Sequence, residues 1–313
     1  MDQNKDVGLY VLVDSNQMAP PEYIPKNAII IKRKSLLGFY TVITSSTLIL
    51  THGLSDKFKL LNQRRQIVIN ITHGMYLKKM HLLLDGCNVA PHFHYVFCMS
   101  QMHVEILSNM FGIPERQVLV KGLPRNSLIK KKSINKHIIE LGEGFSKVHV
   151  WLPTYRKSNQ DGAHVDVNTD SIFGDSAFNF EKMDEILKEK NEYLIIKPHP
   201  MAKYFLPDKE LLNIRVETNA DQMKYGYTLY ELLSAADVLW TDYSSVFIDF
   251  MITKKPIIFV VFDAKEYKEN RGLVIDVDNS ALPGRTIETS EDLYDVIENN
   301  SYNVEYSLKP YVE

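Results

Sequence analysis

The chain has 313 residues, a formal net charge of −3, 45% hydrophobic residues and 24% charged residues. This length allows two domains of ordinary size, and the composition is that of a soluble globular protein without the basic field that nucleic acid binding favours. The start MDQNKDVGLY does not resemble a signal peptide, and apolar stretches such as residues 256–262 are too short to span a bilayer. Cys87 and Cys98 have no metal-ligand spacing, which indicates reduced thiols in a cytoplasmic protein.

Short apolar runs predict two series of β-strands. The first series covers residues 7–13, 28–32, 47–50, 66–71, 94–99 and 117–120, and the second covers 147–152, 193–197, 213–217, 237–241 and 256–262. Most runs lack polar alternation, as expected for strands that are covered on both faces. Helical spacing predicts helices at 100–111, 180–190, 228–236, 244–253 and 290–299, and Thr228 with Glu231 forms a capping box.

A polar, glycine-bearing segment at 132–146 separates the two series. We therefore expect two domains, at residues 1–140 and 141–313, each an α/β unit with a parallel sheet. Ligands of such sheets bind at the carboxyl ends of the strands, so the residues that follow each strand are the candidates for a site.

Several of these strand ends carry groups suited to phosphate. His199 is held in a rigid turn by Pro198 and Pro200, where it can donate to a phosphate oxygen or serve only as a structural histidine. Ser244 and Ser245 open a helix directly after a buried strand, so their hydroxyls can bind an anion or cap the helix.

Further polar residues follow the neighbouring strands. Asp249 lies one helical turn after Ser245 and can reach the same ligand or pair with a cation. Thr154 offers a hydroxyl, followed by Tyr155 and Arg156, and Arg125 suits bidentate phosphate binding.

The tripeptide Thr-His-Gly occurs twice, at 51–53 and 72–74, and each copy follows an apolar run. We expect Lys78 and Lys79 on a helix after the second copy. The sequence has no dinucleotide fingerprint, P-loop or Asp-x-Asp motif, so phosphate-binding groups and histidine bases indicate transfer from a nucleotide diphosphate donor without an evident metal or cofactor.

Six stretches, in order, resemble the CDP-glycerol glycerophosphotransferase family, the teichoic acid and capsule primases and polymerases of bacteria. They are INITHGMYLKKM, VKGLPRNSLI, VWLPTYRKS, YLIIKPHP, AADVLWTDYSSVFIDFMITKKPIIFVVFD and YKENRGLVIDVDNSALPG. The resemblance covers roughly residues 5 to 300 and implies a GT-B fold, in which two Rossmann-like domains face each other. It assigns the acceptor to the first domain and the CDP-linked donor to the second.

The resemblance also implies a reaction and its residues. An acceptor hydroxyl attacks the β-phosphorus of CDP-glycerol and CMP leaves, with His73 as the base and His199 as a second catalytic residue. The remaining substrate-binding positions are Gly74, Arg125, Pro153, Thr154, Pro198, Ser244, Ser245 and Asp249. His52 falls where the family has an ordinary loop, so we expect its replacement to change activity only a few-fold.

The chain departs from the family in places. Thr72 stands where the family usually has Trp, Met75 and Tyr76 stand where it has Thr-Pro, and Tyr155 replaces the Trp of its PTWR motif. The family usually has one more strand and helix before the segment matching residues 8–14, so both a truncated chain and a short natural form are open.

Three alternatives remain open from the sequence. They are the same chemistry with CDP-ribitol or another CDP-alditol, a GT-B glycosyltransferase that uses a nucleotide sugar, and a nucleotide-binding module without activity. Basic runs at 31–35 and 129–137 suggest either solvated loops or attraction to an anionic surface. We expect a cytoplasmic enzyme that is peripheral on the inner face of the cell membrane and uses a lipid-linked or polymeric glycan acceptor.

Overall fold

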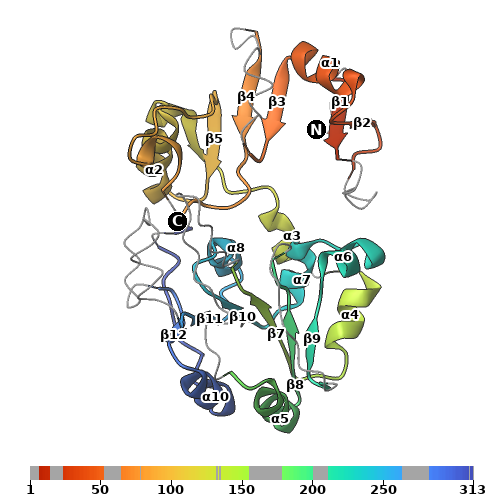
Figure 1. Cartoon of the computed structure of the whole chain (residues 1–313), viewed down its shortest axis with the longest axis vertical. Coiled ribbons are helices and arrows are strands. Elements are labelled where there is room, and N and C mark those ends of the chain that lie inside the picture. Colours follow the sequence, from red (N-terminus) through yellow and green to blue (C-terminus); the bar gives the residue numbers. More distant parts are fainter. Residues whose placement is uncertain are drawn as a thin grey trace.

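The computed structural model describes residues 7–14, 24–52, 65–77, 79–131, 133, 135–154, 178–199, 211–262, 282–309 and 311–312. These residues form two lobes, each built around a parallel β-sheet (Figure 1). Every strand predicted from the sequence is present, within one or two residues at either end. The predicted α/β class with parallel sheets is therefore confirmed.

The first lobe contains a four-stranded sheet in the order β3-β4-β5-β6. Its strands are β3 (Thr47–Leu50), β4 (Ile67–Asn70), β5 (Tyr95–Cys98) and β6 (Val118–Val120). Helix α2 (Met102–Phe111) packs on one face, where Leu107 and Met110 are fully buried against Val96. A separate parallel pair, β1 (Leu9–Val13) and β2 (Ala28–Lys32), carries helix α1 (Leu36–Thr44) at the far end of this lobe (Figure 1).

The other face of the first sheet differs from the expectation. Ile49, Ile67 and Tyr95 share this face by register, and they are 41%, 46% and 39% exposed. Their apolar character therefore does not reflect burial on both sides, although it does reflect the β-propensity of such residues.

The second lobe contains a six-stranded sheet in the order β12-β11-β10-β7-β8-β9. Because β7 and β10 are neighbours and the chain winds outward from them in both directions, this is the doubly wound order of a Rossmann-like sheet. The strands are β7 (Lys147–Leu152), β8 (Glu192–Ile196), β9 (Ile214–Val216), β10 (Val238–Thr241), β11 (Ile257–Val260) and β12 (Arg285–Ile287).

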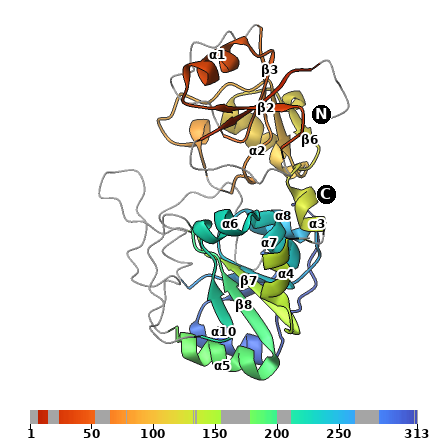
Figure 2. The same cartoon turned by 90° about the vertical axis from the view of Figure 1, so that its right-hand side faces the viewer.

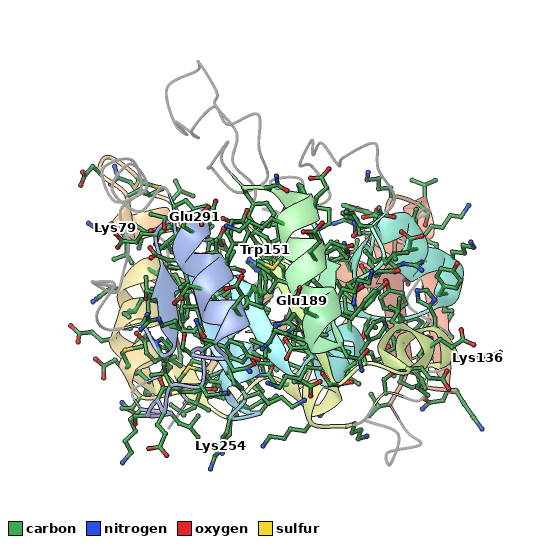
Figure 3. All side chains as sticks on the ribbon, turned by 90° about the horizontal axis from the view of Figure 1, so that it is seen from below. Lys79, Lys136, Trp151, Glu189, Lys254 and Glu291 are labelled. Carbon is green, nitrogen blue, oxygen red and sulfur yellow. The ribbon has the colours of Figure 1, made fainter. Side chains whose placement is uncertain are left out.

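Helices cover both faces of this second sheet. On one face, α5 (Phe180–Lys190) and α10 (Ser290–Glu298) bury Trp151 between them, as Figure 3 shows from below. On the other face, α7 (Leu229–Ala235) and α8 (Val246–Met251) bury Leu232 and Phe247 against the strands. The buried strands of this lobe are therefore as apolar as predicted.

The segment between the sheets is more ordered than its polar sequence indicated. It contains α3 (Asn126–Lys130) and α4 (Lys136–Gly142), which both pack against α7 of the second lobe (Figure 2). Asn135 begins α4 by accepting a hydrogen bond from the backbone N–H of Ile138, and its amide donates to the Tyr225 carbonyl. The division of the chain at residues 140 and 141 falls within α4 and stays a prediction.

Candidate active site

The Thr-His pairs of the two copies, residues 51–52 and 72–73, lie side by side at the carboxyl end of the first sheet. The register pairs Leu50 of β3 with Asn70 of β4, and the backbone N–H of Ile71 continues the ladder by donating to the Leu50 carbonyl at 2.8 Å. Each histidine comes two or three residues after its paired strand end. Neighbouring parallel strands therefore bring His52 and His73 to the same edge of the sheet.

Thr72, the residue before His73, has a strained backbone. Its φ of 52° lies in the left-handed region, which is unusual for a β-branched residue. The Asn70 side chain accepts a hydrogen bond from the Thr72 N–H at 2.8 Å, and the Arg125 guanidinium donates to the Thr72 carbonyl at 2.6 Å. These two contacts hold both sides of the strained residue and so fix the direction of the chain into His73.

His73 is exposed and has aromatic neighbours on two sides. The His52 ring lies parallel to it at 4.2 Å between centroids, and Tyr76 meets it edge-on at 5.7 Å. Burial and the His52 ring lower the pKa of the His73 imidazole from its usual 6.5, with a further lowering from Arg125, while a hydrogen bond to Thr51 opposes this. The neutral form, which can accept a proton, is therefore favoured.

Ser245 of the second lobe comes directly against this loop. A Cβ atom placed on Gly74 would lie 2.6 Å from the Ser245 Oγ, so the missing side chain is what allows the close approach. Ser245 is the N-cap residue of α8, yet its side chain makes no capping hydrogen bond. The hydroxyl next to Gly74 is thus not used to start the helix, in contrast to the capping alternative.

Thr154 lies at the point where the second sheet changes winding direction. Both its backbone N–H and its hydroxyl donate to the Asp242 carboxylate, at 2.9 and 2.8 Å. This contact joins the carboxyl ends of β7 and β10, where ligands of doubly wound sheets bind, and Pro153 is buried beside it. Since a hydroxyl has one hydrogen, Thr154 can donate to a phosphate only by exchanging this bond.

Arg125 and Asp249 are paired with each other. The Asp249 side chain is 2% exposed and accepts from the Arg125 guanidinium at 3.2 Å, and the Tyr230 hydroxyl donates to it at 3.2 Å. In this structure Asp249 contacts protein groups on α7 and on the loop before α3. Its substrate-binding role stays a prediction, and its observed partners are Arg125 and Tyr230.

His199 follows β8 at the same end of the second sheet, and its side chain is exposed. The preceding Pro198 is buried, as is Lys197, whose ammonium donates to the Asn219 amide oxygen. Burial lowers the pKa of Lys197, while the nearby Asp221 and Glu217 carboxylates oppose this lowering.

Some predicted residues are placed differently or are not described. Lys79 lies in an irregular segment before a short 3₁₀ turn (His81–Leu83), so the helix expected there is wrong. Lys78, Tyr155 and Arg156 lie outside the described residues. Within the described ranges, no group of three or more His, Cys, Asp or Glu side chains is placed to hold a metal ion.

Sequence reasoning did not assign four contacting residues to the site, namely His52, Tyr76, Tyr230 and Asp242. It placed His52 on an ordinary loop and Tyr76 among the departures from the family motif, and it gave no role to Tyr230 or Asp242. The one available signal was the repeated tripeptide, which placed two histidines after neighbouring strands.

Two parallel sheets whose carboxyl ends face each other, with the loop that carries His73 in one lobe against Ser245 of the other, form a GT-B type fold. The chain belongs to the family described as CDP-Glycerol:Poly(glycerophosphate) glycerophosphotransferase, which matches residues 1–311. It is therefore an enzyme of this glycerophosphotransferase kind, as the sequence motifs implied.

Known relatives agree with this assignment. The teichoic acid glycerol-phosphate primase of Bacillus subtilis (strain 168) is 30% identical, over 93% of this chain and 76% of that protein. The teichoic acid ribitol-phosphate polymerase TarL of Staphylococcus aureus is 25% identical over 78% of this chain, which spans only 44% of that protein. The wall teichoic acid polymerase TagF shares the fold, with a TM-score of 0.68 at 20% identity over 88% of this chain and 69% of that structure.

Proposed function

We propose that this chain transfers glycerol phosphate from CDP-glycerol to a hydroxyl of a lipid-linked or polymeric acceptor in teichoic acid synthesis. The acceptor hydroxyl gives its proton to His73 while its oxygen attacks the β-phosphorus of the donor. The bond between that phosphorus and the bridging oxygen breaks, and CMP leaves. Family membership and the similarity to a glycerol-phosphate primase support the choice of donor.

The observation that carries this proposal is the close approach of Gly74, in the loop of His73, to the Ser245 hydroxyl. It brings the loop that carries the proposed base, His73, against a hydroxyl of the second lobe that helix capping does not use. We assign Ser244, Ser245 and His199 to the diphosphate, whose charge grows on the departing CMP, and Arg125 to the same cluster as a cation.

The test is to follow nucleotide release with CDP-glycerol, CDP-ribitol and a UDP-sugar, each with and without candidate acceptors. Acceptor-dependent CMP release from CDP-glycerol is the expected result. A preference for CDP-ribitol would place the chain with relatives such as TarL, and release of a nucleoside diphosphate would indicate a glycosyltransferase. A TagF variant has been studied after a soak with CDPG, which makes the same ligand a practical probe here.

We also propose that the enzyme works at an anionic membrane surface. No helix in the described ranges is long and apolar enough to cross a bilayer. Helix α1, however, presents Leu36 and Tyr40 at 91% and 60% exposure, and Lys32 and Lys34 directly precede it and are exposed. Apolar side chains beside lysines are the combination that interfacial helices use.

The second basic run supports this less clearly. His137 turns inward to the buried Glu217, while Lys136 forms an exposed pair with Glu140. Figure 1 places α1 and α4 on the same side of the molecule, in different lobes. The main lipid contact is therefore assigned to α1 and the residues before it.

A further inference from the structure

The two histidines of the repeated tripeptide form a stacked pair. Their rings are 8° from parallel with centroids 4.2 Å apart, and both side chains are exposed on the site side of the first sheet. Such a stack restricts rotation of both rings, because either ring can turn only by losing the contact. The pairing of β3 with β4 in the sheet places the two loops, and therefore the two rings, next to each other.

Hydrogen bonds at Thr51 fix the direction of the pair. The His73 Nδ1 lies 3.3 Å from the Thr51 carbonyl oxygen, and the His52 Nδ1 lies 2.9 Å from the Thr51 hydroxyl. Because a carbonyl oxygen can only accept, the His73 Nδ1 carries a hydrogen. In the neutral ring the lone pair is then on Nε2, which is the atom available to take a proton.

We propose that the first Thr-His-Gly copy positions the second, with the Thr51 carbonyl selecting the tautomer of His73 and the His52 ring holding its orientation. His52 is thus a positioning residue, and its ring, not its proton, is what the reaction needs. The proposal rests on the proposed role of His73 as the base. It replaces the expectation from the sequence that His52 matters little.

The surroundings of His73 agree with this role. Among the described residues, the titratable and charged groups that face it are His52 after β3, Tyr76 on its own loop and Arg125 on the loop before α3. Among the described residues no acidic group is a cause of the His73 pKa shift, and burial, His52 and Arg125 disfavour the imidazolium while the Thr51 carbonyl favours it. A neutral imidazole can accept a proton, but it does so efficiently only when its ring is correctly oriented. The stacked His52 ring supplies this orientation.

The substitutions His52→Ala and His52→Phe test whether the reaction needs the flat ring of His52 or its ability to carry a proton. His52→Ala is expected to lower kcat about 10- to 100-fold, the size of effect that a misplaced catalytic group causes, with the KM for donor within about twofold. His52→Phe keeps a flat ring and is expected to recover kcat to within about threefold of wild type. His92→Ala, an exposed histidine of the first lobe, is the control and is expected to behave as wild type.

NMR of labelled histidine in the free protein gives the decisive readout. The His73 ring is expected as the Nδ1–H tautomer in wild type and His52→Phe, and as a mixture in His52→Ala with its pKa moved upward. Unchanged tautomer and pKa in His52→Ala, or a His52→Phe variant as slow as His52→Ala, would overturn the proposal. Because this readout needs no donor, it stands even if CDP-glycerol proves to be the wrong substrate, which the release assay detects separately.

Discussion

The Arg125 guanidinium donates a 2.6 Å hydrogen bond to the carbonyl of Thr72, the strained residue that precedes His73. The same guanidinium pairs with Asp249 on α8 of the second lobe. One side chain therefore links the loop that carries His73 to the helix that follows the serine pair. This link has consequences for both stability and catalysis.

Replacing Arg125 should destabilise the protein strongly. Arg125→Ala leaves the Asp249 carboxylate, 2% exposed, without its cation, and breaking a buried pair in this way typically costs about 3–5 kcal/mol. Lys136→Ala breaks the exposed Lys136–Glu140 pair and should cost less than about 0.5 kcal/mol. Urea unfolding measures both, and equal free energies of unfolding for the two variants would show that the Arg125 link is not structural.

Substitution of Gly74 should act through Ser245. In Gly74→Ala the new Cβ would lie 2.6 Å from the Ser245 Oγ, so we expect the short side chain to rotate away with little loss of stability. Donor affinity should fall to the level of Ser245→Ala, because both changes remove the same hydroxyl from the site.

The double variant Gly74→Ala/Ser245→Ala checks this reasoning. Changes that act on one group are not additive, so donor binding measured by calorimetry should match that of Ser245→Ala alone. Additive losses in the double variant would mean that Gly74 and Ser245 contribute to the site independently.

The buried His103 should make stability depend on pH. Burial lowers its pKa from 6.5 to about 4, and the side chain is 0% exposed. As pH falls below 6.5 the unfolded chain takes up a proton before the folded chain does, so the free energy of unfolding decreases until the folded group protonates near pH 4. The free energy of unfolding should fall by about 3 kcal/mol in total, because each unit of pKa difference corresponds to about 1.4 kcal/mol.

The variant His103→Leu removes this titration. Its free energy of unfolding should change less between pH 7 and pH 4.5 than that of wild type, although losing the partner of the Ser100 hydroxyl costs about 1 kcal/mol at every pH. Parallel stability curves for the two proteins would show that His103 takes up its proton at the same pH in the folded and unfolded states, which would contradict the lowered pKa.

Helix α1 should be required for binding to anionic vesicles. The double substitution Leu36→Ser/Tyr40→Ser removes exposed apolar area. Adding salt screens the lysines, and each lysine near an anionic surface contributes up to about 1 kcal/mol to binding. Vesicle flotation should show less bound protein in both cases. Leu212→Ser, which changes a residue that is 65% exposed in the second lobe, is the matched control. Equal flotation with neutral and anionic vesicles would show that the lysines do not contribute to membrane binding.

Local sequence predicted most of the fold because the strands of the second lobe are continuous apolar runs. The same reasoning missed β12, whose three residues Arg285–Ile287 contain one buried side chain, Ile287. It also missed α1, where β-branched and aromatic residues mask the helix that Ser35 caps through the Gly38 N–H. These elements depend on tertiary neighbours, which local periodicity does not record.

For the site, sequence reasoning identified strand-end residues but not their partners. The stacking of His52 on His73 requires β3 and β4 to be neighbours in register, and the pairing of Arg125 with Asp249 joins residues 124 positions apart. Spacing along the chain contains neither relationship. Asp249 in particular resembled a ligand-facing carboxylate, and only the fold shows that it is buried against Arg125 and Tyr230.

The central claim is that His73 is the base of a transfer that releases CMP. The most direct measurement compares CDP-glycerol binding by calorimetry with acceptor-dependent CMP release in wild type and His73→Ala. We expect unchanged donor affinity and a loss of CMP release of at least about 10²–10⁴-fold, the usual effect of removing a general base. CMP release within a few-fold of wild type in folded His73→Ala would contradict the claim.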